Sequence, residues 1–157
     1  MNIYKKHIAL LGAALLLIAM PAVAQIEGAV TFDAPFAFYA GDAKMPAGTY
    51  RVTQPDATVP VLLVQDAANS AFVRYMPVDK AGAASQAKVS FTKYGDLEFL
   101  SRISLAGENS ELVISQSEAE ESAASTAAAQ EHSLPATSSE TQPATSTDSQ
   151  PENESNN

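Results

Sequence analysis

Apolar and polar residues alternate in short runs between residues 26 and 116, with the period expected of half-buried β-strands. Val30 and Phe32, for example, alternate with polar neighbours. Residues 59–65 are nearly continuously apolar, which predicts a strand covered on both faces. The sequence of this region has no sustained helical period. The pattern therefore predicts an all-β domain over residues 25–116, a small antiparallel β-sandwich or barrel of about seven to eight short strands.

Two hairpins have recognisable turn residues. In the first, Pro46 presets the backbone for the second position of a type I turn, and Gly48 supplies a left-handed residue that closes the loop. In the second, Gly95 and Asp96 form a two-residue turn after the alternating run 88–94. The return strand should direct four apolar side chains to one face, with Ser101 interrupting it. These four are Leu97, Phe99, Ile103 and Leu105.

The aromatic residues divide by strand parity into two groups. Those predicted to pack in the core are Phe32, Phe36, Phe38, Tyr50, Phe72, Phe91 and Phe99. Tyr39, Tyr75 and Tyr94 have the opposite parity. If these tyrosines cluster outside, they form an aromatic patch suited to contact with a glycan or a protein.

The first 24 residues have the pattern of a secretory signal peptide. A pair of lysines precedes an apolar run over residues 8–20, which is shorter than the ~20 residues of a membrane-spanning helix. Ala22-Val23-Ala24 is a small-x-small cleavage site. We expect removal of residues 1–24, a mature chain that begins at Gln25, and a secreted or periplasmic protein with no membrane span after cleavage. The alternative is a membrane anchor.

Residues 117–157 differ from the rest in composition, with many Ser, Thr, Ala and Glu residues and no Lys or Arg. Their only large aliphatic side chain is Leu134, so they cannot bury enough apolar surface to offset their ordering entropy. A disordered, low-complexity acidic tail is predicted, either a passive spacer or a solvating, tethering extension. One local exception is a capping box from Ser117 to Glu120, which predicts a short helix over residues 118–130.

Composition narrows the chemistry that the chain can perform. Without the signal, 18 acidic residues face seven basic ones, a formal charge of −11 that argues against nucleic acid and anionic lipid as partners. The chain has no cysteine, which excludes disulfides and a cysteine nucleophile. His7 and His132 lie outside the predicted domain, so that domain has no imidazole for a catalytic triad or a metal site. We therefore expect no catalytic residue, metal or cofactor.

A few weaker candidate groups remain. Asp96 and Glu98 flank Leu97 and form a glycosidase-like pair if they share a face; a turn aspartate and a solvent-facing glutamate are the alternative. Two acidic pairs are candidates for calcium and three arginines for an anion site, against the alternative of solvated charges. The acidic pairs are Asp33 with Asp42 and Glu108 with Glu111, and the arginines are Arg51, Arg74 and Arg102.

The chain carries three distinctive segments, Phe36-Ala-Phe, Met45-Pro-Ala-Gly-Thr-Tyr-Arg-Val and Phe91-Thr-Lys-Tyr-Gly-Asp-Leu-Glu-Phe-Leu-Ser. Together they resemble a group of small secreted proteins associated with acidobacterial genomes. The resemblance implies an exported all-β domain and supplies no catalytic positions. The Pro-Ala-Gly-Thr-Tyr corner alone also looks like a turn of prealbumin-like and cupredoxin β-sandwiches. A cupredoxin-like copper site would need His and Cys ligands, which residues 25–116 lack.

We expect an exported, non-catalytic β-domain that acts as an envelope or extracellular binding or structural module for a protein or glycan partner. Two alternatives stay open. A small carboxylate-dependent hydrolase needs two carboxylates that face each other across a cleft at about 5–10 Å. A hollow-barrel ligand carrier needs a cavity of several hundred Å³ in place of a filled core.

Overall fold

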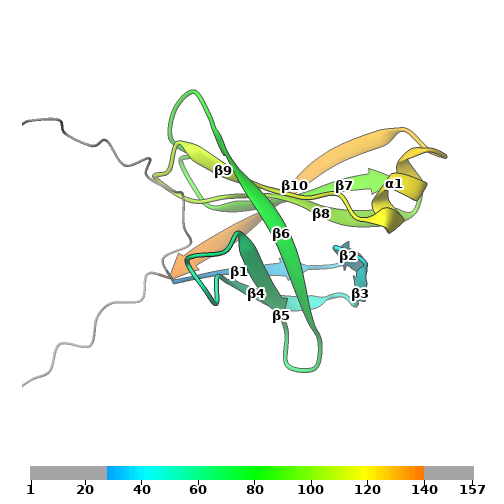
Figure 1. Ribbon diagram of the computed structural model, residues 1–157, viewed down its shortest axis with the longest axis horizontal. Coiled ribbons are helices and arrows are strands. Elements are labelled where there is room, and N and C mark those ends of the chain that lie inside the picture. Colours follow the sequence, from blue (N-terminus) through cyan, green and yellow to red (C-terminus); the bar gives the residue numbers. More distant parts are fainter. Residues whose placement is uncertain (1–27, 140–157) are drawn as a thin grey trace, which may run out of the picture.

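A computed structural model describes residues 28–139, which form ten strands and one short helix (Figure 1). In chain order the strands are β1 (Ala29–Ala34), β2 (Phe38–Ala40), β3 (Ala43–Met45), β4 (Gly48–Thr53), β5 (Val61–Gln65), β6 (Ser70–Asp79), β7 (Lys88–Tyr94), β8 (Leu97–Ser104), β9 (Ser110–Ile114) and β10 (Ala129–Ser139). Helix α1 (Glu118–Ala124) stands between β9 and β10. The predicted signal peptide, residues 1–24, and residues 140–157 of the predicted tail lie outside the described residues.

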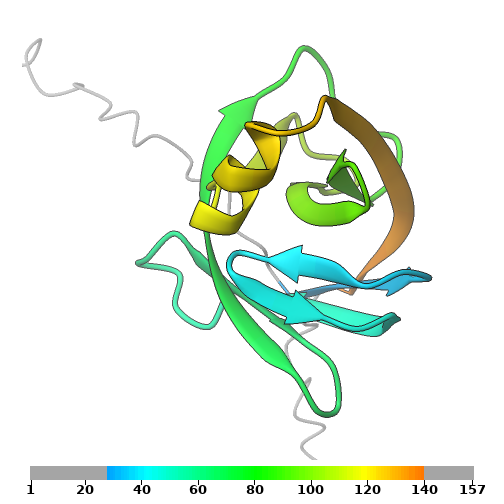
Figure 2. The ribbon, with the colours of Figure 1, turned by 90° about the vertical axis from the view of Figure 1, so that its right-hand side faces the viewer.

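Eight strands close into an antiparallel barrel in the order β8, β7, β10, β1, β4, β5, β6 and β9, because β9 also pairs with β8. The other two strands form a hairpin, and β2 pairs in parallel with β8 through Tyr39 and Phe99. This hairpin and α1 lie at the same end of the barrel (Figures 1 and 2). The all-β prediction is confirmed, and of the two architectures that it left open the structure has the barrel.

Two long strands turn the corners of the barrel. The first half of β6 pairs with β5 and its second half with β9. The first half of β10 pairs with β7 and its second half with β1. Each of these strands therefore passes from one sheet to the other and exchanges its neighbour midway.

Side chains fill the interior of the barrel. Seven of its strands contribute buried apolar residues, and β10 contributes none that is fully buried. Aromatic rings dominate the centre, where the Phe38 ring lies 5.0 Å from Tyr50 and 5.3 Å from Phe91 between centroids. Burial and the nearby Asp66 carboxylate raise the pKa of Tyr50 to about 12. The core is thus an aromatic cluster enclosed by the wall, as expected of a small filled barrel.

The turn predicted for the first hairpin is wrong. The tight turn joins β2 to β3 at Gly41, whose φ is 62°, whereas Gly48 begins β4 with its φ outside the positive range. β4 pairs with β1 and β5 and not with β3. The Tyr50 hydroxyl donates to the Pro46 carbonyl oxygen at 2.6 Å, which holds this corner without a left-handed residue.

The turn predicted for the second hairpin is confirmed. Gly95 has a φ of 61°, and Tyr94 pairs with Leu97 across the two-residue loop. Glycine tolerates this conformation because it has no Cβ to contact the following carbonyl group.

The single apolar face predicted for β8 is wrong because Ser101 forms a bulge. The register shifts between the pair Ser90 and Arg102 and the pair Phe91 and Leu100, so Ser101 has no opposite residue on β7. Leu100 therefore faces the core. Two of the four predicted residues leave that face: Phe99 packs in a second cluster with Tyr94 and Ala123, and Leu97 is 41% exposed.

The prediction of a disordered tail is wrong for residues 117–139. Ser117 caps α1 by accepting a hydrogen bond from the Glu120 N–H at 3.2 Å, which confirms the predicted helix start, although the helix ends at Ala124. Residues 129–139 then form β10 and close the barrel. The composition argument failed because main-chain hydrogen bonds to β7 and β1, which it does not weigh, hold this strand. The domain therefore extends past residue 116.

Candidate binding surface

The side chains of β6 alternate between the barrel core and solvent. Ala71, Val73 and Tyr75 face the core, which places Phe72 and Met76 outside. The parity predicted for Phe72 and Tyr75 is therefore reversed. Apolar residues occur on both faces of this strand, so the pattern alone cannot say which face is buried.

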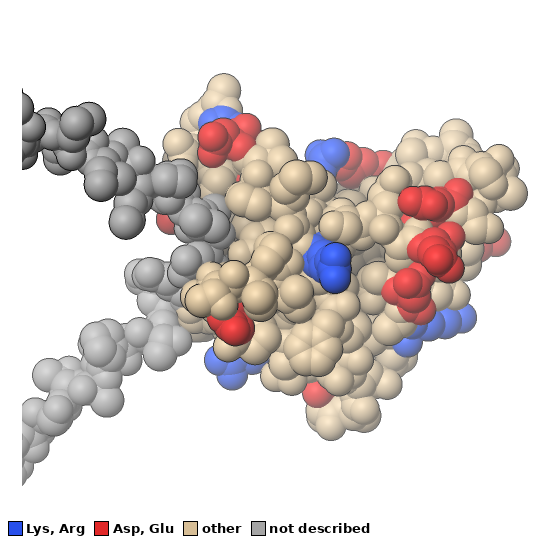
Figure 3. Space-filling view, in the orientation of Figure 1, with Lys and Arg blue, Asp and Glu red and all other residues tan. Residues whose placement is uncertain are grey.

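The outer face of β6 is an apolar surface. Phe72, Met76 and Val78 are 68%, 63% and 44% exposed. Phe72 pairs with Leu63 of β5, and Met76 pairs with Val113 of β9, so the surface continues onto both neighbouring strands. We call this surface the β6 stripe, which comprises Val61, Leu63, Phe72, Met76, Val78 and Val113. Figure 3 shows that the face crossed by β6 is mostly uncharged, with acidic residues gathered at the end where α1 lies.

β5 forms one flank of the β6 stripe. Its inward residues, Leu62 and Val64, are fully buried, whereas Val61 and Leu63 are only half-buried on the outside. The prediction of a strand covered on both faces is therefore wrong. Among residues 28–139 no element packs over the outer face of β5 and β6. Helix α1 packs instead against Tyr94 and Phe99.

Arg74 is the one charged residue of β6 that lies between the apolar members of the β6 stripe. It is exposed, has Phe72 and Met76 on either side of it along the strand, and pairs with Val61 across it. None of the ion pairs among residues 28–139 includes Arg74. The Arg74 guanidinium, which lies between apolar side chains, is therefore available to pair with a carboxylate of another molecule.

The predicted convergence of three arginines on an anion is not found. The Arg102 guanidinium forms an ion pair with Glu131 at 3.1 Å. Arg51 lies opposite Gln65 on β5, at the end of that strand away from Val61, the partner of Arg74. The three arginines stand on different strands, and Arg102 is already paired with a carboxylate of β10.

Asp96 and Glu98 do not form the predicted carboxylate pair. Asp96 is exposed in the turn, whereas Glu98 is buried and its Oε2 lies 2.7 Å from Nε2 of His132. Lys93 Nζ lies 3.5 Å from the other oxygen of Glu98. His132 belongs to β10, so the expectation of a domain without an imidazole is wrong. Its alternation with Leu134 and Ala136 was the signal in the sequence that could have revealed this strand.

His132 packs at the margin of the core. Its ring centroid lies 5.2 Å from that of Phe36 and 5.8 Å from that of Phe91. Within residues 28–139 its hydrogen-bond partner is Glu98, and no serine or threonine hydroxyl contacts it as a nucleophile would in a triad. The same residues contain no group of three or more His, Asp or Glu side chains placed to hold a metal. The hydrogen bond between His132 and Glu98 therefore connects β10 to β8.

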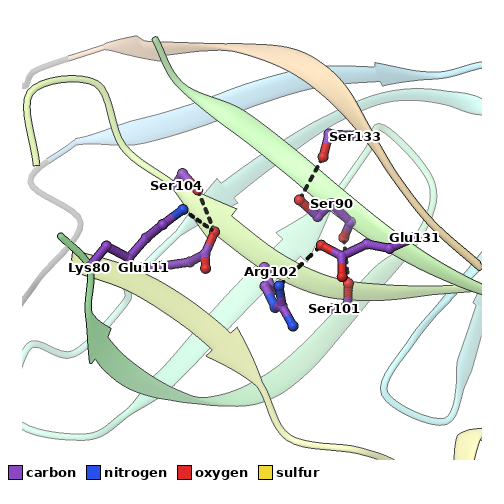
Figure 4. Close-up of polar contacts among 8 residues, drawn as sticks. All are labelled: Lys80, Ser90, Ser101, Arg102, Ser104, Glu111, Glu131 and Ser133. Carbon is purple, nitrogen blue, oxygen red and sulfur yellow. Dashed lines mark hydrogen bonds and ion pairs between the residues drawn. The ribbon is translucent and has the colours of Figure 1, made fainter. Parts of the chain in front are cut away.

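Glu111 is a second buried carboxylate with partners. Its Oε1 accepts hydrogen bonds from the Ser104 hydroxyl at 2.7 Å and from Lys80 Nζ at 3.2 Å (Figure 4). Burial raises the pKa of Glu111, but these hydrogen bonds and the charges of Lys80 and Arg102 outweigh it and hold the pKa below its usual range. The cluster joins β8, β9 and the end of β6.

The predicted calcium pairs do not assemble. Glu108 contacts the loop between β6 and β7 through its main chain and not the Glu111 carboxylate. Asp33 accepts a hydrogen bond from the Thr49 hydroxyl, and Asp42 accepts one from the Ala119 N–H at 3.2 Å. Each aspartate therefore makes a separate structural contact, Asp33 with β4 and Asp42 with α1.

The three tyrosines predicted as an outer patch do not form one, although Tyr39 and Tyr94 both pack against Phe99 in the second cluster. Tyr75 lies in the core. Tyr94 packs against Ala123, and Tyr39 stacks on Phe99 with 5.1 Å between ring centroids. The exposed aromatic residue on the wall is Phe72 instead.

A shallow, open depression of about 410 Å³ lies where β10 separates from β1. Its lining comprises Thr31, Phe32, Asp33, Pro135, Ala136 and Thr137. These residues belong to the wall, and the barrel interior next to them is occupied by aromatic side chains. The depression is therefore not the internal cavity that a ligand carrier needs.

No family model, curated protein or solved structure matches this chain. Helix α1 has seven residues, and the described part of the chain forms no helix with the length and apolar character needed to span a bilayer.

Proposed function

We propose that this chain is an exported, non-catalytic β-barrel that binds another protein through the β6 stripe. The observation that carries the proposal is the exposure of Phe72 and Met76, at 68% and 63%, on a strand whose other face fills the core. Aromatic and methionine side chains are enriched in protein interfaces. Removing their apolar surface from water gains roughly 25 cal/mol per Å².

The charge on the surface specifies the partner further. Arg74 is surrounded by apolar neighbours and forms no ion pair within residues 28–139. The fitting partner therefore presents an apolar surface with a carboxylate opposite Arg74. Such a pair orients the complex, because a charge left without its partner at an interface costs free energy.

The non-catalytic part of the proposal rests on the polar clusters. The His132 and Glu98 pair has no hydroxyl nucleophile within residues 28–139, and Glu111 is held by Ser104 and Lys80. Both clusters join strands, and neither Glu98 nor Glu111 lines the depression between β1 and β10. The export part rests on the signal pattern of residues 1–24.

Photo-crosslinking in the producing cells tests the proposal. A photoreactive phenylalanine analogue replaces Phe72 in one variant and Leu97 in a matched control, since Leu97 is also exposed but lies at the tip of a hairpin. We expect a crosslink to one different protein from position 72 and not from position 97. Arg74→Glu should reduce its yield, and Arg51→Glu, outside the stripe, should not. A crosslink only to a second copy of the chain, or equal crosslinking from both positions, would contradict the proposal.

A further inference from the structure

β10 occupies a place in the barrel that its side chains do little to secure. None of its eleven residues is fully buried, and only His132, Leu134 and Ala136 are half-buried toward the interior. β6, the other corner strand, buries Ala71 and Val73 among others. Main-chain hydrogen bonds therefore supply most of what holds β10.

Pro135 divides these hydrogen bonds into two sets. The Ala136 N–H donates to the Ala87 carbonyl oxygen at 3.0 Å, on the side of β7, so the nitrogen of Pro135 is directed toward β1. Proline has no N–H to donate, and the ladder to β1 ends at the pair Phe32 and Ala136. β10 thus has β7 alone as its neighbour before this point, and the depression in the wall opens there.

Three side-chain contacts make the site specific for the sequence of β10. Ser133 Oγ lies 2.9 Å from Ser90 Oγ, and Glu131 forms its ion pair with Arg102 at 3.1 Å (Figure 4). His132 contacts Glu98 at 2.7 Å. A strand with another sequence would leave the buried Glu98 without this partner. The strand that fits between the edges of β7 and β1 is therefore β10 itself, from the same chain or from another copy of it.

The chain on either side of α1 allows β10 to leave while the helix stays. α1 is held by Ala123, which packs with Tyr94 and Phe99, and by the hydrogen bond from the Ala119 N–H to Asp42. Residues 125–128 then connect it to β10 as a short segment outside the regular elements. Rotation of the backbone in this segment would direct β10 away from its own barrel.

We infer that two copies of this chain exchange β10, each inserting the strand between β7 and β1 of the other. The exchanged pair keeps the contacts of β10 with β7 and β1, because the same residues meet across two chains. Such exchange of an identical element is a route to dimers with low cost in contacts. The inference does not depend on the β6 stripe, which lies on a different strand.

Cysteine pairs test the inference, because the chain has no cysteine of its own. A chain with only Ser90→Cys is mixed with a chain with only Ser133→Cys at high concentration, and the mixture is incubated below its unfolding midpoint and oxidised. Ser90 and Ser133 face each other across β7 and β10, so exchange brings the two thiols together between chains. We expect a covalent heterodimer as the main product.

The matched control is a mixture of chains carrying Asp33→Cys or Thr49→Cys. These residues face each other across β1 and β4, which stay within one chain during exchange. The heterodimer should form several-fold less in this control. A second exchange pair, Thr92→Cys with Glu131→Cys, covers the case in which the Ser90 variant does not fold. Equal heterodimer yields from exchange and control mixtures, or none from both exchange pairs, would overturn the inference.

Discussion

β6 and β10 are the two corner strands of the barrel, but different interactions hold them in place. Both turn a corner, and each pairs one half with one sheet and one half with the other. β6 buries Ala71, Val73 and Tyr75 in the core, whereas β10 buries no side chain fully. The comparison shows that strand pairing closes this barrel and that core burial decides which strand is firmly anchored. It also separates two roles, since β6 presents an apolar outer surface and β10 a polar one.

The largest difference should come from truncating inward side chains on the two strands. Val73→Ala on β6 should lower the free energy of unfolding by about 2 kcal/mol, because two fully enclosed methyl groups are lost and a cavity remains. Leu134→Ala on β10 should cost only about 1 kcal/mol, since Leu134 is partly buried at the margin of the core. Urea unfolding measures both values. Equal losses would mean that β10 is anchored by burial after all.

Hydrogen exchange should rank the main-chain hydrogen bonds of the two strands in the same order. Amides of β10 should exchange at least about tenfold faster than those of β6, a difference of ~1.4 kcal/mol in opening free energy. The physical reason is that local opening of β10 exposes little apolar surface. Mass spectrometry of peptides covering 70–79 and 129–139 measures the two rates. Slower exchange in β10 would reverse the comparison.

Adding a methyl group at Gly41, in the turn between β2 and β3 that packs on β6, should lower the stability of the protein. Gly41 has a φ of 62°, and a Cβ there would lie 3.7 Å from Val73 Cγ1, so space exists but the left-handed backbone does not suit alanine. Gly41→Ala should cost about 1 kcal/mol. Gly48→Ala is the matched control, since its Cβ would meet a Tyr50 ring carbon at an ordinary 3.7 Å and no strain arises. A comparable loss from Gly48→Ala in thermal unfolding would restore the turn predicted from the sequence.

The smallest effects should be two pH dependences of opposite sign. Glu111 lies opposite Val78 of β6, and its pKa in the folded protein is below the usual 4.5. Its contribution to the free energy of unfolding is therefore present above pH 4.5 and is lost as the pH falls through the folded pKa. Burial raises the pKa of Glu120, in the helix before β10, so its contribution is lost as the pH rises through the raised value.

The matched substitutions follow from these signs. At pH 7, Glu111→Gln should destabilise the protein and Glu120→Gln should stabilise it, and both differences from the original chain should shrink as the pH falls below about 4.5. Melting temperatures over pH 3–8 measure this. A Glu120→Gln variant that is less stable at pH 7 would show that its carboxylate has a partner which outweighs its burial.

The features that were predictable from the sequence depend on residues that are close together along the chain. Alternation revealed the strands, Gly95 marked the two-residue turn, and Ser117 marked the start of α1. The bulge at Ser101 was not predictable, because it exists only relative to the residues on β7 that face it. The parity of β6 was not predictable either, since both of its faces are apolar.

The candidate sites were less predictable for the same reason. The partner of the buried Glu98 is His132, which lies 34 residues away in a segment whose composition indicates disorder. Composition measures how much a segment can bury and takes no account of the hydrogen bonds that two existing strand edges offer it. The β6 stripe was not predictable because alternation allows either Phe72 or Tyr75 to face the core, and the structure has Tyr75 inside.

The pairing of β1 with β10 sets the order in which this protein can be completed. Phe32 pairs with Ala136, roughly 100 residues later in the chain, so β1, the first strand of residues 28–139, cannot complete its pairing until β10, the last strand of that range, has been synthesised. Until that partner has emerged, the nascent chain is an open sheet with two free edges. Completion of the wall should therefore be the slow step of folding, and chain ends that stop before residue 129 should yield material prone to edge-to-edge association.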